Sequence, residues 1–130
     1  MDKKILFTAS LLGMVAIILG AFGAHSLKQV LTLEQLTTFE TGVKYQMYHA
    51  LFLLFLGINN TITEKSKKII FRLISFGVLF FSGSIYFLAT MGITGINFKV
   101  IGIVTPIGGL LLIVGWGLFA LQFLKNKSQI

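Results

Sequence analysis

Few side chains in this sequence could bind a ligand, hold a metal ion or carry a proton. The chain of 130 residues has two histidines and no cysteine, which excludes thiolate metal sites, cysteine nucleophiles and disulfides. The other candidates are tyrosine, serine and threonine side chains that lie within or beside long apolar runs. The polar site predicted from them consists of His25, Thr41, Tyr45, His49, Ser82, Ser84, Tyr86 and Thr105.

Three kinds of chemistry are open to this group. Thr41, Tyr45 and His49 follow one another at a spacing of four, so a helix presents them as a ladder on one face, and we expect His25 and His49 at one depth. The group could hydrogen-bond between helices, or form an outward-opening site for a small solute or an ion. His25, His49 and Glu40 are weak candidates for a zinc or iron site, since they show no ligand-spacing motif. No catalytic residue and no cofactor is predicted, and we expect a protein that is not an enzyme.

The elements that position these residues are predicted to be membrane helices. The apolar fraction is 55%, against roughly 45 to 50% for soluble domains even with glycine included, and the mean hydropathy is +0.91. The net charge of +7 could indicate a nucleic-acid partner. The basic residues stand at the ends of apolar runs, however, so the sequence favours the lipid bilayer as the partner and no nucleic acid.

Four uncharged runs are long enough to cross a hydrocarbon core of roughly 30 Å. They predict one all-α integral membrane domain over residues 1–130, a four-helix bundle with spans at about 5–24, 43–62, 69–91 and 104–124. The first run could instead be a cleaved signal peptide, with Asp2, Lys3 and Lys4 before it and Ala21 to Gly23 resembling a cleavage site. Its length exceeds that of a usual signal sequence, which favours a retained helix.

The orientation follows from the basic residues near the span ends. With both termini in the cytoplasm of a plasma-membrane protein, Lys28, Lys44 and Lys99 lie outside. The inner face then holds the other eight, which are Lys3, Lys4, Lys65, Lys67, Lys68, Arg72, Lys125 and Lys127.

Two helix starts are marked by local signals. Thr32 to Gln35 has the form of a capping box, which predicts one helix from Leu33 through Ile58 with an outer extension before the second span. For the fourth span, Thr105 could be an N-cap with Pro106 opening the helix, or one helix could run from about Val100 with a kink at Pro106. We favour the N-cap.

Small residues predict how the helices pack, because helices in a bilayer associate through close contacts and polar bonds. The first span carries one continuous stripe of them, formed by Ala9, Gly13, Ala16, Gly20 and Ala24. Close packing, and with it a homo-oligomer, is consistent with this pattern.

Several short motifs together resemble a known family. They are Gly20-Ala-Phe-Gly-Ala-His25, Thr41-Gly-Val-Lys-Tyr45-Gln-Met-Tyr-His49-Ala, Phe81-Ser-Gly-Ser-Ile-Tyr86, and Thr105-Pro-Ile-Gly-Gly109 with Gly115-Trp116. In this order, they are similar to the small membrane proteins of domain of unknown function 423, which include the transmembrane protein 256 type. The resemblance implies a multi-pass membrane protein with a retained first span, and it assigns no activity and no site. Lys44 departs from the neutral or acidic residue expected before Tyr45.

Two functions are compatible with the sequence. The first is binding or permeation of a small solute or ion through the outer polar site, with an unknown ligand. The alternative is an oligomeric membrane scaffold or assembly factor whose polar cluster is purely structural. A permeation path requires polar groups that continue from Tyr86 inward through Ser82 and Ser75, whereas a scaffold does not.

Overall fold

The computed structural model describes residues 2–95 and 99–127, and its regular elements there are all helical. The four long helices are α1 (Asp2–His25), α2 (Leu33–Ile58), α3 (Glu64–Ala89) and α5 (Val104–Lys127). Between them lie the short helices η1 (Leu27–Gln29), α4 (Met91–Thr94) and η2 (Lys99–Ile103).

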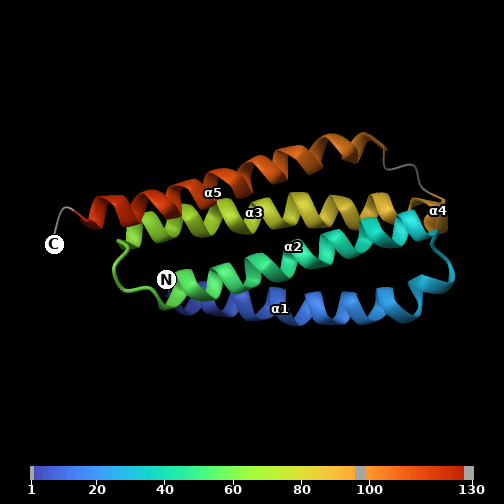
Figure 1. The fold of residues 1–130 in the computed structure, drawn as a ribbon, viewed down its shortest axis with the longest axis horizontal. Helices are drawn as coiled ribbons and strands as arrows, with labels where there is room; N and C mark the ends of the chain where they lie inside the picture. The colour runs from blue at the N-terminus through green and yellow to red at the C-terminus, as the bar shows by residue number, and fades with distance from the viewer. Residues whose placement is uncertain (1, 96–98, 128–130) are drawn as a thin grey trace.

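The long helices run antiparallel to their neighbours in sequence, in the order α1, α2, α3 and α5 (Figure 1). α1 packs against α2, α2 against α3, and α3 against α5. α1 begins and α5 ends at the same end of the molecule, which we call the Asp2 end; the opposite end, where α1 stops, is the His25 end (Figure 1). α1 and α5 therefore form the two edges, and α2 and α3 form the central pair.

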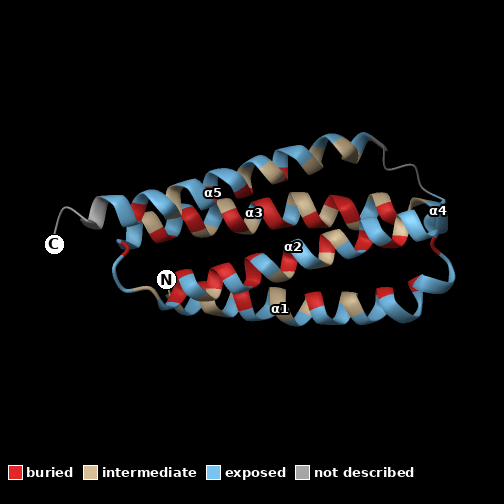
Figure 2. Ribbon diagram, in the orientation of Figure 1, coloured by how far each residue is buried: buried red, intermediate tan, exposed pale blue. Residues whose placement is uncertain are grey.

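Three of these helical stretches are long and apolar enough to cross a membrane: Asp2–Gln29, Glu64–Ala89 and Val100–Leu124. Only 17% of the most apolar part of the first and the last is buried, against 44% for α3, so the edge helices present most of their apolar surface outward. Figure 2 shows the buried residues concentrated along α2 and α3. Large apolar side chains such as Phe7, Ile17 and Leu110 are more than half exposed, as is expected where lipid is the solvent.

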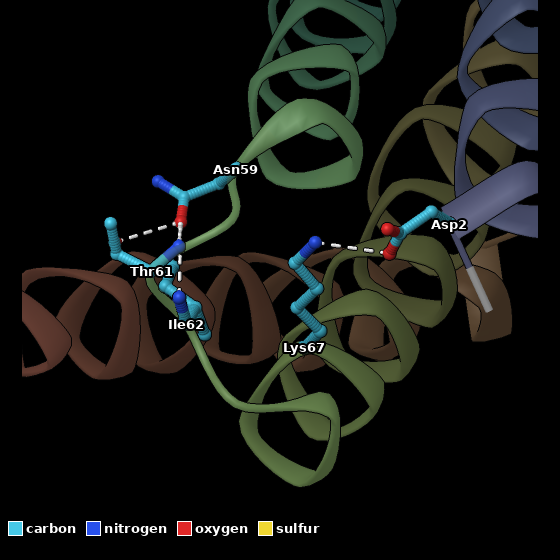
Figure 3. A network of polar contacts seen from close by, with 5 residues as sticks. All are labelled: Asp2, Asn59, Thr61, Ile62 and Lys67. Atoms are coloured by element: carbon cyan, nitrogen blue, oxygen red, sulfur yellow. Dashed lines mark hydrogen bonds and ion pairs between the residues drawn. The ribbon is translucent and has the colours of Figure 1, made fainter.

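α2 begins as predicted, at a capping box. Thr32 Oγ1 accepts a hydrogen bond from the Gln35 backbone N–H at 3.1 Å, and Gln35 Oε1 accepts one from the Thr32 N–H at 3.0 Å. The helix ends at Ile58, as predicted for one helix from Leu33, so the predicted span of about 43–62 extends past it. Asn59 Oδ1 accepts from the backbone N–H groups of Thr61 and Ile62, which offers these groups an alternative to the helix (Figure 3).

The start of α5 matches neither of the two predicted alternatives. The α-helix begins at Val104, directly after the 3-10 helix η2, so Pro106 lies in its first turn, where a missing N–H costs little. The predicted N-cap role of Thr105 is wrong, because this residue lies inside the helix and its hydroxyl is 2.5 Å from Ser84 Oγ of α3.

Glycines bring the long helices close together at two interfaces. In α1, a Cβ at Gly13 would lie 3.8 Å from Ala50 Cβ, and one at Gly20 would lie 3.5 Å from Val43. The approach of α5 to α3 is closer still. A Cβ at Gly108 would meet backbone atoms of α3, including the carbonyl carbon of Phe80 at 2.8 Å. The α3–α5 contact therefore depends on a glycine at position 108.

Candidate functional site

Gln46 lies at the centre of the polar contacts between helices. Its side chain is 4% exposed on α2, and its Nε2 donates to the Leu12 carbonyl of α1 at 2.9 Å. The same amide accepts, through Oε1, a hydrogen bond of 2.7 Å from the Tyr86 hydroxyl of α3. One side chain thereby joins three helices, and both of its polar atoms have a partner.

A second bond joins α2 and α3 one turn from Gln46. Ser82 Oγ donates to the Gly42 carbonyl at 2.7 Å, and Ser82 is 1% exposed. The Gly42 carbonyl oxygen has two lone pairs, and one is available for the bond within its own helix. The serine hydroxyl therefore donates to the second lone pair of this oxygen. Gly42 is packed tightly here, since a Cβ would lie 2.7 Å from the Tyr86 ring.

His49 connects α2 to α5. The Trp116 indole Nε1 donates to His49 Nε2 at 3.0 Å, and His49 Nδ1 lies 2.6 Å from the Tyr45 carbonyl. An indole N–H can only donate, so Nε2 is the acceptor and the neutral ring carries its proton on Nδ1, toward Tyr45. Phe52 packs beside this pair, with its ring centroid 4.4 Å from that of Trp116. Both ring nitrogens of His49 are therefore occupied.

Ser84 and Thr105 complete the set by joining α3 to α5. Their hydroxyl oxygens are 2.5 Å apart, and Ser84 Oγ also donates toward the Phe81 carbonyl at 3.0 Å. Of the predicted residues, the structure thus places His49, Ser82, Ser84, Tyr86 and Thr105 in bonds between helices.

The other predicted residues stand apart from these bonds. Thr41 donates to the Thr37 carbonyl of its own helix. Tyr45 is 38% exposed, and its ring packs against Phe81 at a centroid distance of 5.0 Å. His25 and Glu40 are exposed on α1 and α2.

The expectation that His25 and His49 share one depth is wrong. His25 is the last residue of α1, beyond the level where Gly23 meets Phe39, whereas His49 is next to Ala50, which faces Gly13. At about 1.5 Å per residue, the two histidines are separated by roughly 18 Å along the axis of α1. The predicted metal candidates His25, His49 and Glu40 therefore do not come together, and the described residues contain no group of three or more histidine, aspartate or glutamate side chains that could hold a metal ion.

An ion pair at the Asp2 end was missed by the sequence analysis. Lys67 Nζ lies 3.0 Å from Asp2 Oδ1, joining the start of α3 to the start of α1 (Figure 3). Lys67 is 2% exposed although it was counted among the lysines of the inner face, and Asp2 is 44% exposed. The available signal was the placement of Asp2 and Glu64 at two helix starts on the side where every other charge is basic.

Two further residues were undervalued. Gln46 and Trp116 were named only within the family motifs and not in the predicted polar site. The signal for Gln46 was its position, one residue from Tyr45, as an amide inside an uncharged run that must find partners. For Trp116 it was the indole N–H, which usually finds an acceptor.

Comparisons with known proteins support the conclusion that this chain is a membrane protein. A family model described as "Protein of unknown function (DUF423)" matches residues 19–109. A UPF0382 membrane protein of Staphylococcus saprophyticus is 43% identical over 88% of this chain and 91% of its own length. One of Haemophilus influenzae is 35% identical over 98% and 99%. No solved structure gives a significant match. The chain is thus a membrane protein that belongs to the DUF423 family, as its similarity to these UPF0382 membrane proteins also indicates.

Proposed function

We propose that this protein is a non-enzymatic membrane scaffold or assembly factor whose intramembrane polar residues hold its helices together. The observation that carries the proposal is the position of α2, which makes side-chain hydrogen bonds to each of the other three long helices. These bonds run from Gln46 to α1, from Gln46 and Gly42 to α3, and from His49 to α5. Each of these side chains is already hydrogen-bonded within the protein, which favours a structural role over solute binding.

The same proposal includes four spans with both termini in the cytoplasm. α2 is the one long helix that is not a candidate span; its 26 residues are as many as those of α3, so its composition and not its length sets it apart. It is also rich in buried residues. If α1 and α3 both cross the bilayer in the same direction, the chain must return between them, and α2 is the element that lies there (Figure 1). Because its polar side chains are paired inside the protein, the lower hydropathy of α2 is compatible with crossing.

An enzyme is less well supported by this arrangement. Ser84 bonds to Phe81 and Thr105, while the ring nitrogens of His49 face Trp116 and Tyr45. A nucleophile requires a base within hydrogen-bond reach, and neither residue is paired in that manner.

The proposal also places the protein in the plasma membrane.

Solute permeation is a second candidate, favoured by one observation. Tyr86, Ser82 and Ser75 follow one another along α3 toward the Asp2 end and line one groove between α1 and α3, together with Gln46. However, Tyr86, Gln46 and Ser82 already form hydrogen bonds within the protein.

The experiment that separates the two candidates uses Tyr86→Phe, which removes one hydroxyl and leaves the ring. A structural role predicts a lower unfolding midpoint in detergent, and fluxes of glycerol, Na⁺ and protons that are the same in wild-type proteoliposomes as in protein-free liposomes. A wild-type flux that disappears in Tyr86→Phe at an unchanged midpoint would contradict the scaffold and support permeation.

The four-span topology is tested separately, since the natural chain has no cysteine. A cysteine at Ser26 should react with a membrane-impermeant maleimide added outside intact cells, and a cysteine at the exposed Lys65 should react only after the cells are opened. The reverse pattern would overturn the orientation, and labelling of both from outside would overturn the number of spans.

A further inference from the structure

The groove between α1 and α3 differs from the hydrogen-bonded sites because one buried hydroxyl of its lining has no hydrogen-bond partner. We call it the α1/α3 groove; it has a volume of about 500 Å³ and is lined by parts of residues 8–19 of α1 and 75–86 of α3, with Gln46 of α2. It exists because both helices pack on α2 while they meet each other directly through the ion pair at the Asp2 end.

Ser75 gives this groove its chemistry. Its Oγ is buried and, among the described residues, is the one buried side-chain nitrogen or oxygen without a hydrogen-bond partner. An unsatisfied buried hydroxyl costs about 1 to 3 kcal/mol, and most buried polar groups in proteins have a partner. Ser75 lies at the end of the groove that is nearer to the Asp2 end, where Thr8 of α1 also lines it. The polar residues Gln46, Ser82 and Tyr86 already have partners.

The walls of the groove suit a straight alkyl chain. Leu11, Leu12, Val15 and Leu19 form the α1 wall, and Val78 and Leu79 contribute to the α3 wall. From residue 75 to residue 86 the groove follows α3 for roughly 16 Å, at about 1.5 Å per residue. The rim is open at Gly83, where a Cβ would meet nothing within 4 Å.

We propose that the α1/α3 groove binds a linear alkyl alcohol, with the hydroxyl of the ligand hydrogen-bonded to Ser75 Oγ and the chain extended along the leucine wall toward Tyr86. The unpaired hydroxyl of Ser75 at one end of a mostly apolar groove matches a ligand with one terminal oxygen and an unbranched tail. This binding activity goes beyond the scaffold role and does not depend on it.

The test uses photocrosslinking in liposomes with a diazirine-tagged dodecan-1-ol, whose extended chain is similar in length to the groove. Adducts should map to the α1 and α3 residues that line the groove. Unlabelled dodecan-1-ol should compete about fivefold better than dodecane, as expected for one neutral hydrogen bond. Ser75→Ala should remove that difference while leaving competition by dodecane unchanged.

The matched pair Gly83→Leu and Gly117→Leu tests the location. Both glycines have empty space around the Cβ position, so both variants are expected to fold, but only Gly83 lines the groove. Gly83→Leu should reduce the adducts at least tenfold, with Gly83→Ala in between as a milder obstruction, and Gly117→Leu should leave them unchanged. Equal labelling of the two leucine variants, adducts spread evenly over the lipid-facing helices, or a preference for the alcohol that persists in Ser75→Ala would each overturn the proposal.

Discussion

Two of the grooves beside the central helices differ in their lining and in the contacts next to them. The α1/α3 groove is mostly aliphatic, and an ion pair joins α1 and α3 at the Asp2 end. The α2/α5 groove is lined mainly by aromatic rings, among them Tyr48, Phe55 and Phe123, and has a volume of about 530 Å³. Trp116, which bonds His49, lines this groove, as do Phe52 and Phe119, whose ring centroids are 4.9 Å apart.

The two grooves differ in whether the polar side chains near them all have hydrogen-bond partners within the protein. Along the α2/α5 groove, the histidine and the tryptophan satisfy each other, so their polarity serves to fix α5 against α2. Along the α1/α3 groove, Gln46, Ser82 and Tyr86 are committed in the same way, but Ser75 is not. A residue type alone does not distinguish Ser75 from Ser82, since both are serines on one helix seven positions apart.

The largest effect is expected from separating α5 from α3, which would dismantle the α2/α5 groove and leave the α1/α3 groove in place. Gly108→Leu places side-chain atoms against the backbone of Phe80, which cannot move aside as a flexible side chain can. We expect a loss of about 3 kcal/mol or more in the free energy of unfolding, at the upper end for overpacking. An SDS titration in detergent micelles measures it, and Gly117→Leu is the control. A Gly108→Leu protein as stable as that control would refute the close α3–α5 contact.

The next largest effect concerns the ion pair that joins α1 and α3 at the Asp2 end. Asp2→Asn leaves the Lys67 ammonium buried without its charged partner, whereas Lys67→Met removes the buried charge and leaves Asp2, 44% exposed, in contact with water. We expect Asp2→Asn to cost about 2 kcal/mol, below the range for fully buried pairs, and Lys67→Met to cost clearly less. The unfolding midpoints of the two variants measure this order. The opposite order would mean that Lys67 reaches water.

A smaller effect is expected at the hydrogen bond between Trp116 and His49, which joins α5 to α2 beside the α2/α5 groove. Trp116→Phe removes the indole N–H but keeps an aromatic ring beside Phe52, and His49→Phe removes the acceptor. In a double-mutant cycle the two changes should be coupled by about 0.6 kcal/mol, the average for hydrogen bonds between membrane helices. Additive single changes would show that the Trp116–His49 contact contributes no stability.

Much of the fold follows from local features of the sequence. The long uncharged runs predict the long helices, and the capping box at Thr32 predicts the start of α2, because both depend on residues close together in the chain. The end of α2 at Ile58 also agrees with the predicted helix, and the Asn59 side chain accepts from the backbone just beyond it. The start of α5 was not predicted, because η2 leads directly into the helix and Thr105 bonds Ser84 of another helix.

The site was less predictable because it depends on the register between helices. His25 ends one apolar run and His49 precedes another, but the packing of Gly13 on Ala50 and of Gly23 on Phe39 places them at different levels. The pairing of Lys67 with Asp2, and of Trp116 with His49, joins residues 65 and 67 positions apart. No spacing within one helix indicates such pairs.

The most direct test of this account compares Ser82→Ala with Ser75→Ala, one serine with a partner and one without, by the free energy of unfolding in the same detergent. We predict that Ser82→Ala costs roughly 1 kcal/mol, because it leaves the Gly42 carbonyl without its second partner and removes a buried bond. Ser75→Ala should be neutral or stabilising, because it removes an unsatisfied buried hydroxyl. An equal loss in both variants, or a larger loss in Ser75→Ala, would contradict the assignment of Ser82 to structure and of Ser75 to an open groove.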